Sequence, residues 1–313
     1  MSRIRIAFLG TPEISKSFLE DLIKDEHFEV VGVITQPDRP AGRKMKLTPS
    51  PVKALAENLG IPVLSPETVN TPQVREQVQA WKAEACVVVA FGQLLSQKFL
   101  DLFPNRVVNV HASLLPRWRG AAPVQRSLMA GETVTGVSLQ VMVKKLDAGP
   151  LLGLRKIPVA EDMNAVELFG EMARAGKDLL AVDFMDYLRG NLSPEPQEEG
   201  EATYAAKIDK AEARIDWSLP ARDIHNRIRG LAAGPQAFTQ RGGKILKVHR
   251  SQVKDIAATL KPGALLQKEN HLFVGTGEGV LELLEVQPES KPRMAAAEYL
   301  KGKSVQSGES LGT

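Results

Sequence analysis

The feature that most constrains this chain is a regular alternation of short apolar runs with helical segments in its first half. The apolar runs are rich in β-branched side chains, as are strands buried on both faces of a parallel sheet, and they cover residues 3–9, 29–35, 85–90 and 107–110. Helical patterns separate them, over residues 15–24, 51–59, 72–82 and 97–102. This rhythm predicts an α/β fold with a doubly wound, Rossmann-like parallel sheet, whose ligands bind beyond the carboxyl ends of the strands.

The turn after the first predicted strand excludes the most common ligand of such a sheet. It reads Gly10-Thr11-Pro12-Glu13 and lacks the three glycines that let a backbone approach a pyrophosphate. We therefore do not expect NAD or FAD to bind.

The second half of the chain has a different pattern. Another apolar run (151–159) and a long helical pattern (165–188) are followed by residues 189–202, which are rich in Pro, Gly and Glu and read as a linker or a surface crossing. Beyond it, a helical segment (221–229) precedes short strand-like runs, at residues 242–250, 271–277 and 279–288. We predict a smaller, OB-like β-barrel there, with domains at 1–189 and 209–313 and a linker at 190–208.

Composition bounds the class of protein. Of 313 residues, 43% are apolar and 25% are charged, as in soluble globular proteins. No apolar stretch approaches the roughly 18 residues of a membrane span, and the first residues run directly into a strand pattern, so we expect a cytoplasmic protein that does not contact membranes. The single cysteine, Cys86, lies in an apolar run and is predicted to pack in the core.

Charge is unevenly distributed along the chain. The net charge is only +3, but residues 222–254 contain one acid, Asp223, and eight basic residues: Arg222, Arg227, Arg229, Arg241, Lys244, Lys247, Arg250 and Lys254. This segment predicts a local basic surface of the kind that contacts a phosphate backbone.

The residues that point to chemistry lie at the end of the fourth predicted strand. Asn109 and His111 are two residues apart, so their side chains share one face of a strand. An amide donor beside an imidazole can polarise a carbonyl and stabilise an oxyanion. Taken alone, such a pair more commonly serves only to satisfy backbone groups of the adjoining loop.

Two neighbours favour the chemical interpretation. The segment SLLPRWRGAAP (113–123) holds two prolines and a glycine, which fix a loop at the same sheet edge. Asp147 follows the strand-like run 136–143, where a carboxylate could orient His111 or relay a proton. Alone, an Asp before Ala-Gly-Pro is more often a turn residue.

Together these residues resemble the folate-dependent formyltransferases, and within that family the members that act on methionyl initiator tRNA. The similarity spans nearly the whole chain. The matching segments are GTPE (10–13), TQPDRPAGR (35–43), SPVK (50–53), VVVAFG (87–92), NVHASLLPRWRGAAPVQ (109–125), LDAGP (146–150) and EARIDWS (212–218).

The resemblance implies transfer of the formyl group of 10-formyltetrahydrofolate to the α-amine of methionine esterified to initiator tRNA. It implies that Asn109 and His111 stabilise the formyl oxygen and that Asp147 sets the state of His111 and helps to move a proton. The folate is expected to lie between two segments, Phe91-Gly92-Gln93-Leu94 and Ser113-Leu114-Leu115-Pro116. The formyl donor is already activated, so neither a metal nor a covalent nucleophile is expected. Phe91 and Leu94 could equally be core residues.

The resemblance also implies two tRNA-binding regions. One is the segment 38–51, which its composition alone predicts to be a solvated mobile loop; the expected contacts there are Arg39, Arg43, Lys44 and Lys46. The other is the C-terminal domain, where the expected contacts are Arg222, Arg229, Lys244 and Lys247. The sequence departs from the family pattern at Lys44-Met45, at Ala148 and at residues 232–235. None of these departures touches Asn109, His111 or Asp147.

Two other functions stay open at the level of sequence. One is a related enzyme, either a sugar-nucleotide formyltransferase or a formyltetrahydrofolate hydrolase, and the other is an RNA-binding protein without catalysis. We expect a monomer. For Arg117, Trp118 and Arg119 the sequence offers two roles, contact with the tRNA end or bracing of the loop.

Overall fold

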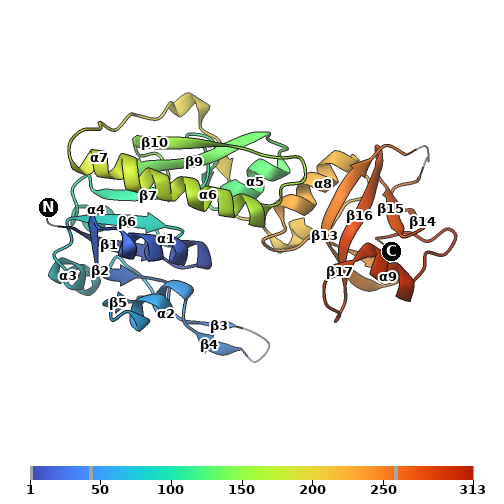
Figure 1. Cartoon of the computed structure of the whole chain (residues 1–313), viewed down its shortest axis with the longest axis horizontal. Coiled ribbons are helices and arrows are strands. Elements are labelled where there is room, and N and C mark those ends of the chain that lie inside the picture. The colour runs from blue at the N-terminus through green and yellow to red at the C-terminus, as the bar shows by residue number, and fades with distance from the viewer. Residues whose placement is uncertain (1–2, 42–44, 257–259, 313) are drawn as a thin grey trace. The chain divides into compact units, whose positions relative to one another are not determined.

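The computed structural model of the chain describes residues 3–41, 45–256 and 260–312, and divides it into two compact units (Figure 1). The first unit consists of Met1–Gly120, Gly136–Ile157 and Gly170–Tyr204, and the second of Ala121–Thr135, Pro158–Phe169 and Ala205–Thr313. Two short segments that precede Gly170 thus belong to the second unit. The domain boundaries that we placed at residues 189 and 208 stay a prediction.

The first unit is built on a seven-stranded sheet with the strand order β10-β9-β7-β6-β1-β2-β5. Its parallel strands are β1 (Ile4–Gly10), β2 (Phe28–Ile34), β5 (Val63–Leu64), β6 (Ala85–Val89) and β7 (Val107–His111). Next to β7 the antiparallel strand β9 (Val134–Val141) follows, and β10 (Leu151–Pro158) forms the edge. The parallel, doubly wound sheet predicted from the apolar runs is confirmed.

Helices alternate with the parallel strands along the chain, as the predicted βαβ rhythm requires. They are α1 (Glu13–Lys24), α2 (Pro51–Asn58), α3 (Pro72–Ala80) and α4 (Gln97–Leu100). The side chains of Ser50 and Thr71 accept hydrogen bonds from the first turns of α2 and α3, whose first residue is proline in each case. Apolar residues of α3 and α4 pack with one face of β1 and β6.

The long helix predicted over residues 165–188 is interrupted. It consists of α6 (Ala165–Leu179), a π-helical turn (Leu180–Phe184) and α7 (Met185–Leu188). Asp183 in the π-helical turn pairs with Arg155 of β10, with Nη2 and Oδ2 2.6 Å apart. The hydrogen bonds that Arg155 donates to the Asp183 carboxylate raise the pKa of the Arg155 guanidinium.

The segment 38–51, whose composition suggested a solvated mobile loop, contains regular structure. Two strands, β3 (Arg39–Ala41) and β4 (Lys46–Thr48), pair as an antiparallel hairpin in which Pro40 lies opposite Leu47. At the base of the hairpin, Lys53 Nζ lies 2.9 Å from Asp38 Oδ1. Local strand pairing, which a count of prolines and charges cannot show, gives this segment its structure.

The segment that we interpreted as a linker or surface crossing is bonded to the first unit as far as Thr203. The backbone N–H of Leu151 donates to Glu195 O at 2.7 Å, and that of Arg119 donates to Thr203 O at 2.8 Å. A 3-10 turn (Glu199–Glu201) lies between these bonds, and the short strands β8 (Arg119–Gly120) and β11 (Tyr204–Ala205) pair beside them.

The second unit contains an antiparallel sheet and several short helices. Its strand order is β12-β13-β16-β15-β14, and β17 pairs with β16. Its elements are α5 (Pro123–Met129), a 3-10 turn (Lys210–Ala213), α8 (Ala221–Gly230), β12 (Phe238–Arg241), β13 (Lys244–Lys254), β14 (Leu265–Lys268), β15 (His271–Gly275), β16 (Val280–Pro288), β17 (Met294–Ala295) and α9 (Ala296–Gly302). The predicted smaller C-terminal β domain is confirmed, and it is built on an antiparallel sheet.

The end of the chain joins the two edges of this sheet. Leu311 N–H donates to Gly263 O at 2.8 Å, just before β14, and Gly312 N–H donates to Gln240 O of β12 at 2.9 Å. Both edges therefore have backbone partners, which is how a barrel protects strands that would otherwise be open to other chains.

Two further features bear on the class of protein. Cys86 is fully buried in the first unit, where burial raises the pKa of its thiol, so the predicted core role is confirmed. Across the ranges 3–41, 45–256 and 260–312, no helix is long and apolar enough to cross a bilayer.

Candidate active site

The candidate site lies at the carboxyl edge of the parallel strands in the first unit. Asn109 of β7 pairs in register with Val88 of β6, and Gly10 of β1 pairs with Val89 of β6. The residues that follow these three neighbouring strands are therefore gathered at one edge, where ligands of such sheets bind.

His111, the last residue of β7, has a polar neighbour at each ring nitrogen. Its Nε2 lies 2.9 Å from Trp118 O, and because a carbonyl oxygen only accepts, Nε2 carries the hydrogen of this bond. Its Nδ1 faces Asp147 Oδ2 at 3.7 Å. The imidazole is 6% exposed and is thus fixed in orientation.

Asp147 is anchored in a tight turn. Its Oδ2 accepts a hydrogen bond from the backbone N–H of Gly120 at 2.8 Å, and its Oδ1 accepts one from Gln140 Nε2 at 3.1 Å. Its backbone φ of 47° lies in the left-handed region, which costs a non-glycine residue about 1 to 3 kcal/mol and persists only where surrounding contacts impose it.

The glycine of the LDAGP segment is required by a close approach of backbone. A Cβ at Gly149 would lie 1.7 Å from the carbonyl oxygen of Val141. Only glycine fits there without moving the Asp147 turn.

Asn109 differs from His111 in that its side chain is not engaged. Within the described part of the chain it accepts and donates no side-chain hydrogen bond, and it is only partly buried. Its amide can therefore donate to a ligand at the strand end. The structure thus brings the three predicted catalytic side chains to one place. Of the two on β7, His111 is hydrogen-bonded to the described residues of the protein and Asn109 is not.

The loop after β7 owes its stiffness to a set of hydrogen bonds. Ser113 Oγ donates to Arg117 O at 2.6 Å. Ser138 Oγ donates to Ser113 O at 2.8 Å and accepts from Leu115 N–H at 3.0 Å. Ser113 and Leu115 are buried, whereas Leu114 and Pro116 are partly exposed. The loop is therefore braced by the buried side chains of Ser113 and Ser138.

The other predicted folate segment follows β6. The Phe91 ring is 2% exposed and belongs to the core, and its carbonyl oxygen accepts bonds from Thr11 Oγ1 and Gln36 Nε2. Gln93 is tied by its side chain to Val69 N–H and Pro66 O. Gly92 has a φ of 87°, and the Leu94 side chain is 72% exposed. Of the four, Gly92 and Leu94 offer accessible surface.

Two residues that sequence reasoning did not single out complete the surroundings of Asp147. Gln140 of β9 bonds to its carboxylate, and Gln197 bonds to the backbone of its turn. Arg119, whose role the sequence left open, is fully buried and donates to Gln197 and Glu199. It braces the site from inside. No sequence signal marked Gln197, because it lies in a segment with almost nothing to bury.

The predicted tRNA-binding residues fall into different environments. On the β3–β4 hairpin, Arg39 is exposed and pairs with Glu67 at 3.0 Å, and Lys46 is exposed. Arg43 and Lys44 lie outside the described residues.

In the second unit, Lys244 is exposed at the start of β13, Lys247 is half-buried beside Gln236, and Arg222 is exposed and pairs with Glu161. Arg229 differs from these, because it is 6% exposed. Its guanidinium donates to Asn226 Oδ1 and to the carbonyl oxygens of Ala160 and Met163, and burial lowers its pKa. The buried guanidinium therefore contributes to the packing of α8 and does not face solvent.

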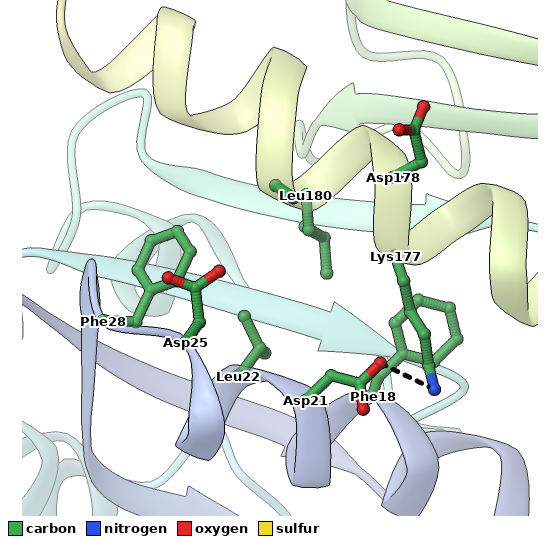
Figure 2. Close-up of a pocket in the computed structure, with 9 residues that line it drawn as sticks. Phe18, Asp21, Leu22, Asp25, Phe28, Lys177, Asp178 and Leu180 are labelled. Atoms are coloured by element: carbon green, nitrogen blue, oxygen red, sulfur yellow. Dashed lines mark ion pairs between the residues drawn. The ribbon is translucent and has the colours of Figure 1, made fainter.

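A separate hollow lies on a helical face of the first unit, between α1 and α6 (Figure 2). Phe18, Leu22 and Phe28 line its apolar part, and Lys177 Nζ pairs with Asp21 Oδ2 across it at 2.8 Å. It contains none of the predicted site residues. In the described ranges, no group of three or more His, Cys, Asp or Glu side chains could hold a metal ion.

Comparison with known proteins gives matches over both halves of the chain. Residues 4–182 match the family model "Formyl transferase", and residues 207–304 match "Formyl transferase, C-terminal domain". The chain is 53% identical to the methionyl-tRNA formyltransferase of Bdellovibrio bacteriovorus, with 100% of both chains covered. It is 42% identical to that of Bacillus velezensis, with 98% of each covered.

A solved structure shares the fold at low identity. The structure of HypX from Aquifex aeolicus in complex with tetrahydrofolic acid superposes with a TM-score of 0.67 at 17% identity, over 97% of this chain and 48% of that one. The family models and the full-length relatives agree with the architecture, and the chain belongs to the methionyl-tRNA formyltransferase family.

Proposed function

We propose that this enzyme transfers the formyl group of 10-formyltetrahydrofolate to the α-amine of methionine esterified to initiator tRNA, and that it works in the cytoplasm as a monomer. The observation that carries the proposal is the meeting of Asn109, His111 and Asp147 at the carboxyl edge of the sheet, with His111 and Asp147 3.7 Å apart. Membership of the methionyl-tRNA formyltransferase family supplies the two substrates.

The reaction needs charge stabilisation and movement of a proton. As the amine nitrogen bonds to the formyl carbon, negative charge develops on the formyl oxygen; the bond from that carbon to the folate nitrogen then breaks, and a proton passes from the amine to the leaving nitrogen. Asn109 suits the first task, because its amide is not engaged by the protein.

His111 and Asp147 suit the second task. Their facing atoms are placed to hand a proton between the imidazole and the carboxylate as the amine loses one. His111 also reaches the formyl oxygen if its Nε2–H leaves Trp118 O when the substrates bind. Catalytic hydrogen bonds commonly take their final form only in the complex.

Substrate binding is divided between the two units. In the first, we place the pterin against the backbone of Gly92 and the residues Leu94, Leu114 and Pro116, which are the accessible members of the two predicted folate segments. For the tRNA we retain Arg39 and Lys46 on the hairpin, together with Arg43 and Lys44. In the second unit we retain Arg222, Lys244 and Lys247, and leave Arg229 out because it is buried.

One assay separates this function from its alternatives. Purified enzyme is incubated with 10-formyltetrahydrofolate and methionyl initiator tRNA, and both tetrahydrofolate and N-formylmethionine are quantified. Equal amounts of the two products are expected. Tetrahydrofolate without formylmethionine would identify a hydrolase, and tRNA binding with neither product would identify a non-catalytic protein. A variant carrying both His111→Ala and Asp147→Ala provides the background rate.

A further inference from the structure

We propose that Gln197 is a positioning residue for Asp147, which it controls by holding the backbone of the turn that carries this carboxylate. The proposal rests on the formyl transfer proposed above. All the contacts that carry it lie within the first unit. Gln197 itself belongs to the segment after α7, whose composition suggested only a connection.

The amide of Gln197 holds both ends of the Asp147 turn. Its Nε2 donates to Asp147 O at 2.9 Å and to Gly149 O at 2.7 Å. These two carbonyls flank Ala148, so one side chain fixes the turn on either side of it. Because the φ of Asp147 is positive, the turn needs such a restraint to keep its conformation.

Arg119 determines which way this amide faces. Gln197 Oε1 accepts from Arg119 Nη2 at 2.9 Å and from Nε at 3.2 Å. A guanidinium only donates, so the amide oxygen must face Arg119 and the NH2 group must face the two carbonyls. The position therefore requires an acceptor on one side and a donor of two hydrogens on the other, which glutamine supplies and glutamate does not.

Arg119 is anchored independently of Gln197. It is fully buried, and its Nη1 donates to both carboxylate oxygens of Glu199 at 3.1 Å. Glu199 also pairs with Lys145, two residues before Asp147. These charge-assisted hydrogen bonds lower the pKa of the Glu199 carboxyl, the bond from Lys145 first and that from Arg119 next. A change at Gln197 thus leaves the rest of this arrangement in place.

The position of the turn decides the geometry of the reacting groups. Asp147 Oδ2 must meet the Gly120 N–H and lie near His111 Nδ1 at the same time. A displacement of about 1 Å in such a site can lower a rate about 100-fold. The expected consequence of losing the Gln197 contacts is therefore a lower kcat rather than weaker binding.

Two variants separate positioning from stability. Gln197→Glu keeps an acceptor oxygen for Arg119 but sets the other carboxylate oxygen against two carbonyl oxygens, which pushes the turn away. Gln197→Met keeps the length of the side chain, leaves the carbonyls without a donor and leaves two guanidinium donors unbonded, so it loses more stability. We expect kcat to fall about 100-fold in Gln197→Glu and about 10-fold in Gln197→Met. We expect Tm to fall more in Gln197→Met than in Gln197→Glu.

The control carries the same chemical change away from the site. Gln77 is an exposed residue of α3 in the same unit, and Gln77→Glu should leave kcat, KM and Tm at the parent values. In both Gln197 variants KM for each substrate should stay within about twofold of the parent. A kcat that follows Tm across the two variants, or a raised KM with unchanged kcat, overturns the proposal.

A second readout does not depend on turnover. The chain has five histidines, and selective ¹⁵N labelling allows the His111 ring nitrogens to be followed and assigned with His111→Gln. Gln197→Glu should shift the His111 signals, and Gln77→Glu should not. If the parent forms no formylmethionine, the proposed function fails and this shift still tests positioning. If the parent is active and the His111 signals do not move, positioning alone fails.

Discussion

Nδ1 of His111 lies 3.7 Å from Oδ2 of Asp147, and only 7% and 10% of the two side chains are exposed. The two residues are 36 positions apart in the sequence. His111 is the last residue of β7, and Asp147 lies in the turn after β9, the strand that pairs with β7. Nε2 of His111 is bonded to Trp118 O, and Nδ1 is the ring atom that faces Asp147.

Replacing either member of this pair should abolish most of the turnover. His111→Ala and Asp147→Ala are each expected to lower kcat more than about 100-fold, the scale of general acid–base and oxyanion contributions, with tRNA affinity nearly unchanged. Single-turnover formylation and filter binding measure the two effects. Lys177→Ala, which breaks an ion pair on the helical face of the same unit, should leave both unchanged. Lost tRNA affinity in the His111 or Asp147 variants would place the chemistry elsewhere.

Asn109 should contribute to the transition state rather than to binding. Asn109→Ala removes a donor to the developing oxyanion and is expected to lower kcat about 100- to 1000-fold. Asn109→Asp should be at least as severe, because a carboxylate repels that negative charge. Steady-state kinetics with both substrates measure the change. An increase in KM at unchanged kcat would show that the amide holds substrate and does not stabilise charge.

Gly149 should tolerate no side chain. In Gly149→Ala the new Cβ must displace the backbone at Val141, and such overpacking typically costs about 1 to 3 kcal/mol in the free energy of unfolding. Activity should fall with it, because Gly149, whose own backbone must also shift, belongs to the Asp147 turn. Urea denaturation and kcat measure the two losses. Gly170→Ala, on α6 where a Cβ meets nothing within 4 Å, should be neutral or stabilising. Equal changes of stability and kcat in Gly149→Ala and Gly170→Ala would contradict this prediction.

Exposed and buried basic residues of the second unit should behave differently toward tRNA. Lys244→Ala removes an exposed cation and is expected to lower the magnitude of the slope of log K against log [salt] by about 1, with Tm unchanged. Arg229→Ala should leave that slope unchanged and lower Tm, because the buried guanidinium satisfies carbonyls of Ala160 and Met163. A change of slope in Arg229→Ala would restore Arg229 as a phosphate contact.

The closure of the C-terminal sheet should depend on pH through Glu309. Hydrogen bonds from the buried Arg241 guanidinium lower the pKa of this carboxyl from 4.5 to about 2. A lowered folded-state pKa stabilises the fold above the ordinary pKa, and this contribution fades as the pH falls from 4.5 towards 2. The difference in the free energy of unfolding between the parent and Glu309→Gln should therefore be about 1 to 3 kcal/mol at pH 6 and should shrink below pH 4.

Chemical denaturation over that pH range measures the difference. The exposed Glu289 provides a control, since Glu289→Gln should track the parent at every pH. A difference for Glu309→Gln that grows towards low pH would reverse the assigned sign.

The sequence by itself determined the parallel sheet, the helices that cover it and the three candidate catalytic residues. Strands buried on both faces must be apolar throughout, and helices must repeat their apolar positions, so both patterns can be read locally. The position of Asn109 and His111 at a strand end follows from the same pattern. Taken alone, this pair could either stabilise an oxyanion or only satisfy backbone groups of the loop. The loop at 113–123 and Asp147 favoured the first interpretation.

Tertiary structure decided which of these side chains are engaged. Phe91 and Arg229 carry the residue types of a ligand contact, yet both are buried, because the neighbouring elements enclose them. Gln197 has no local signal at all, and its role follows only from the buried Arg119, which lies 78 positions away in the chain and fixes the direction of its amide. Periodicity reports which face of an element is apolar, but hydrogen bonds between distant segments depend on how the chain is folded, and only the folded chain shows them.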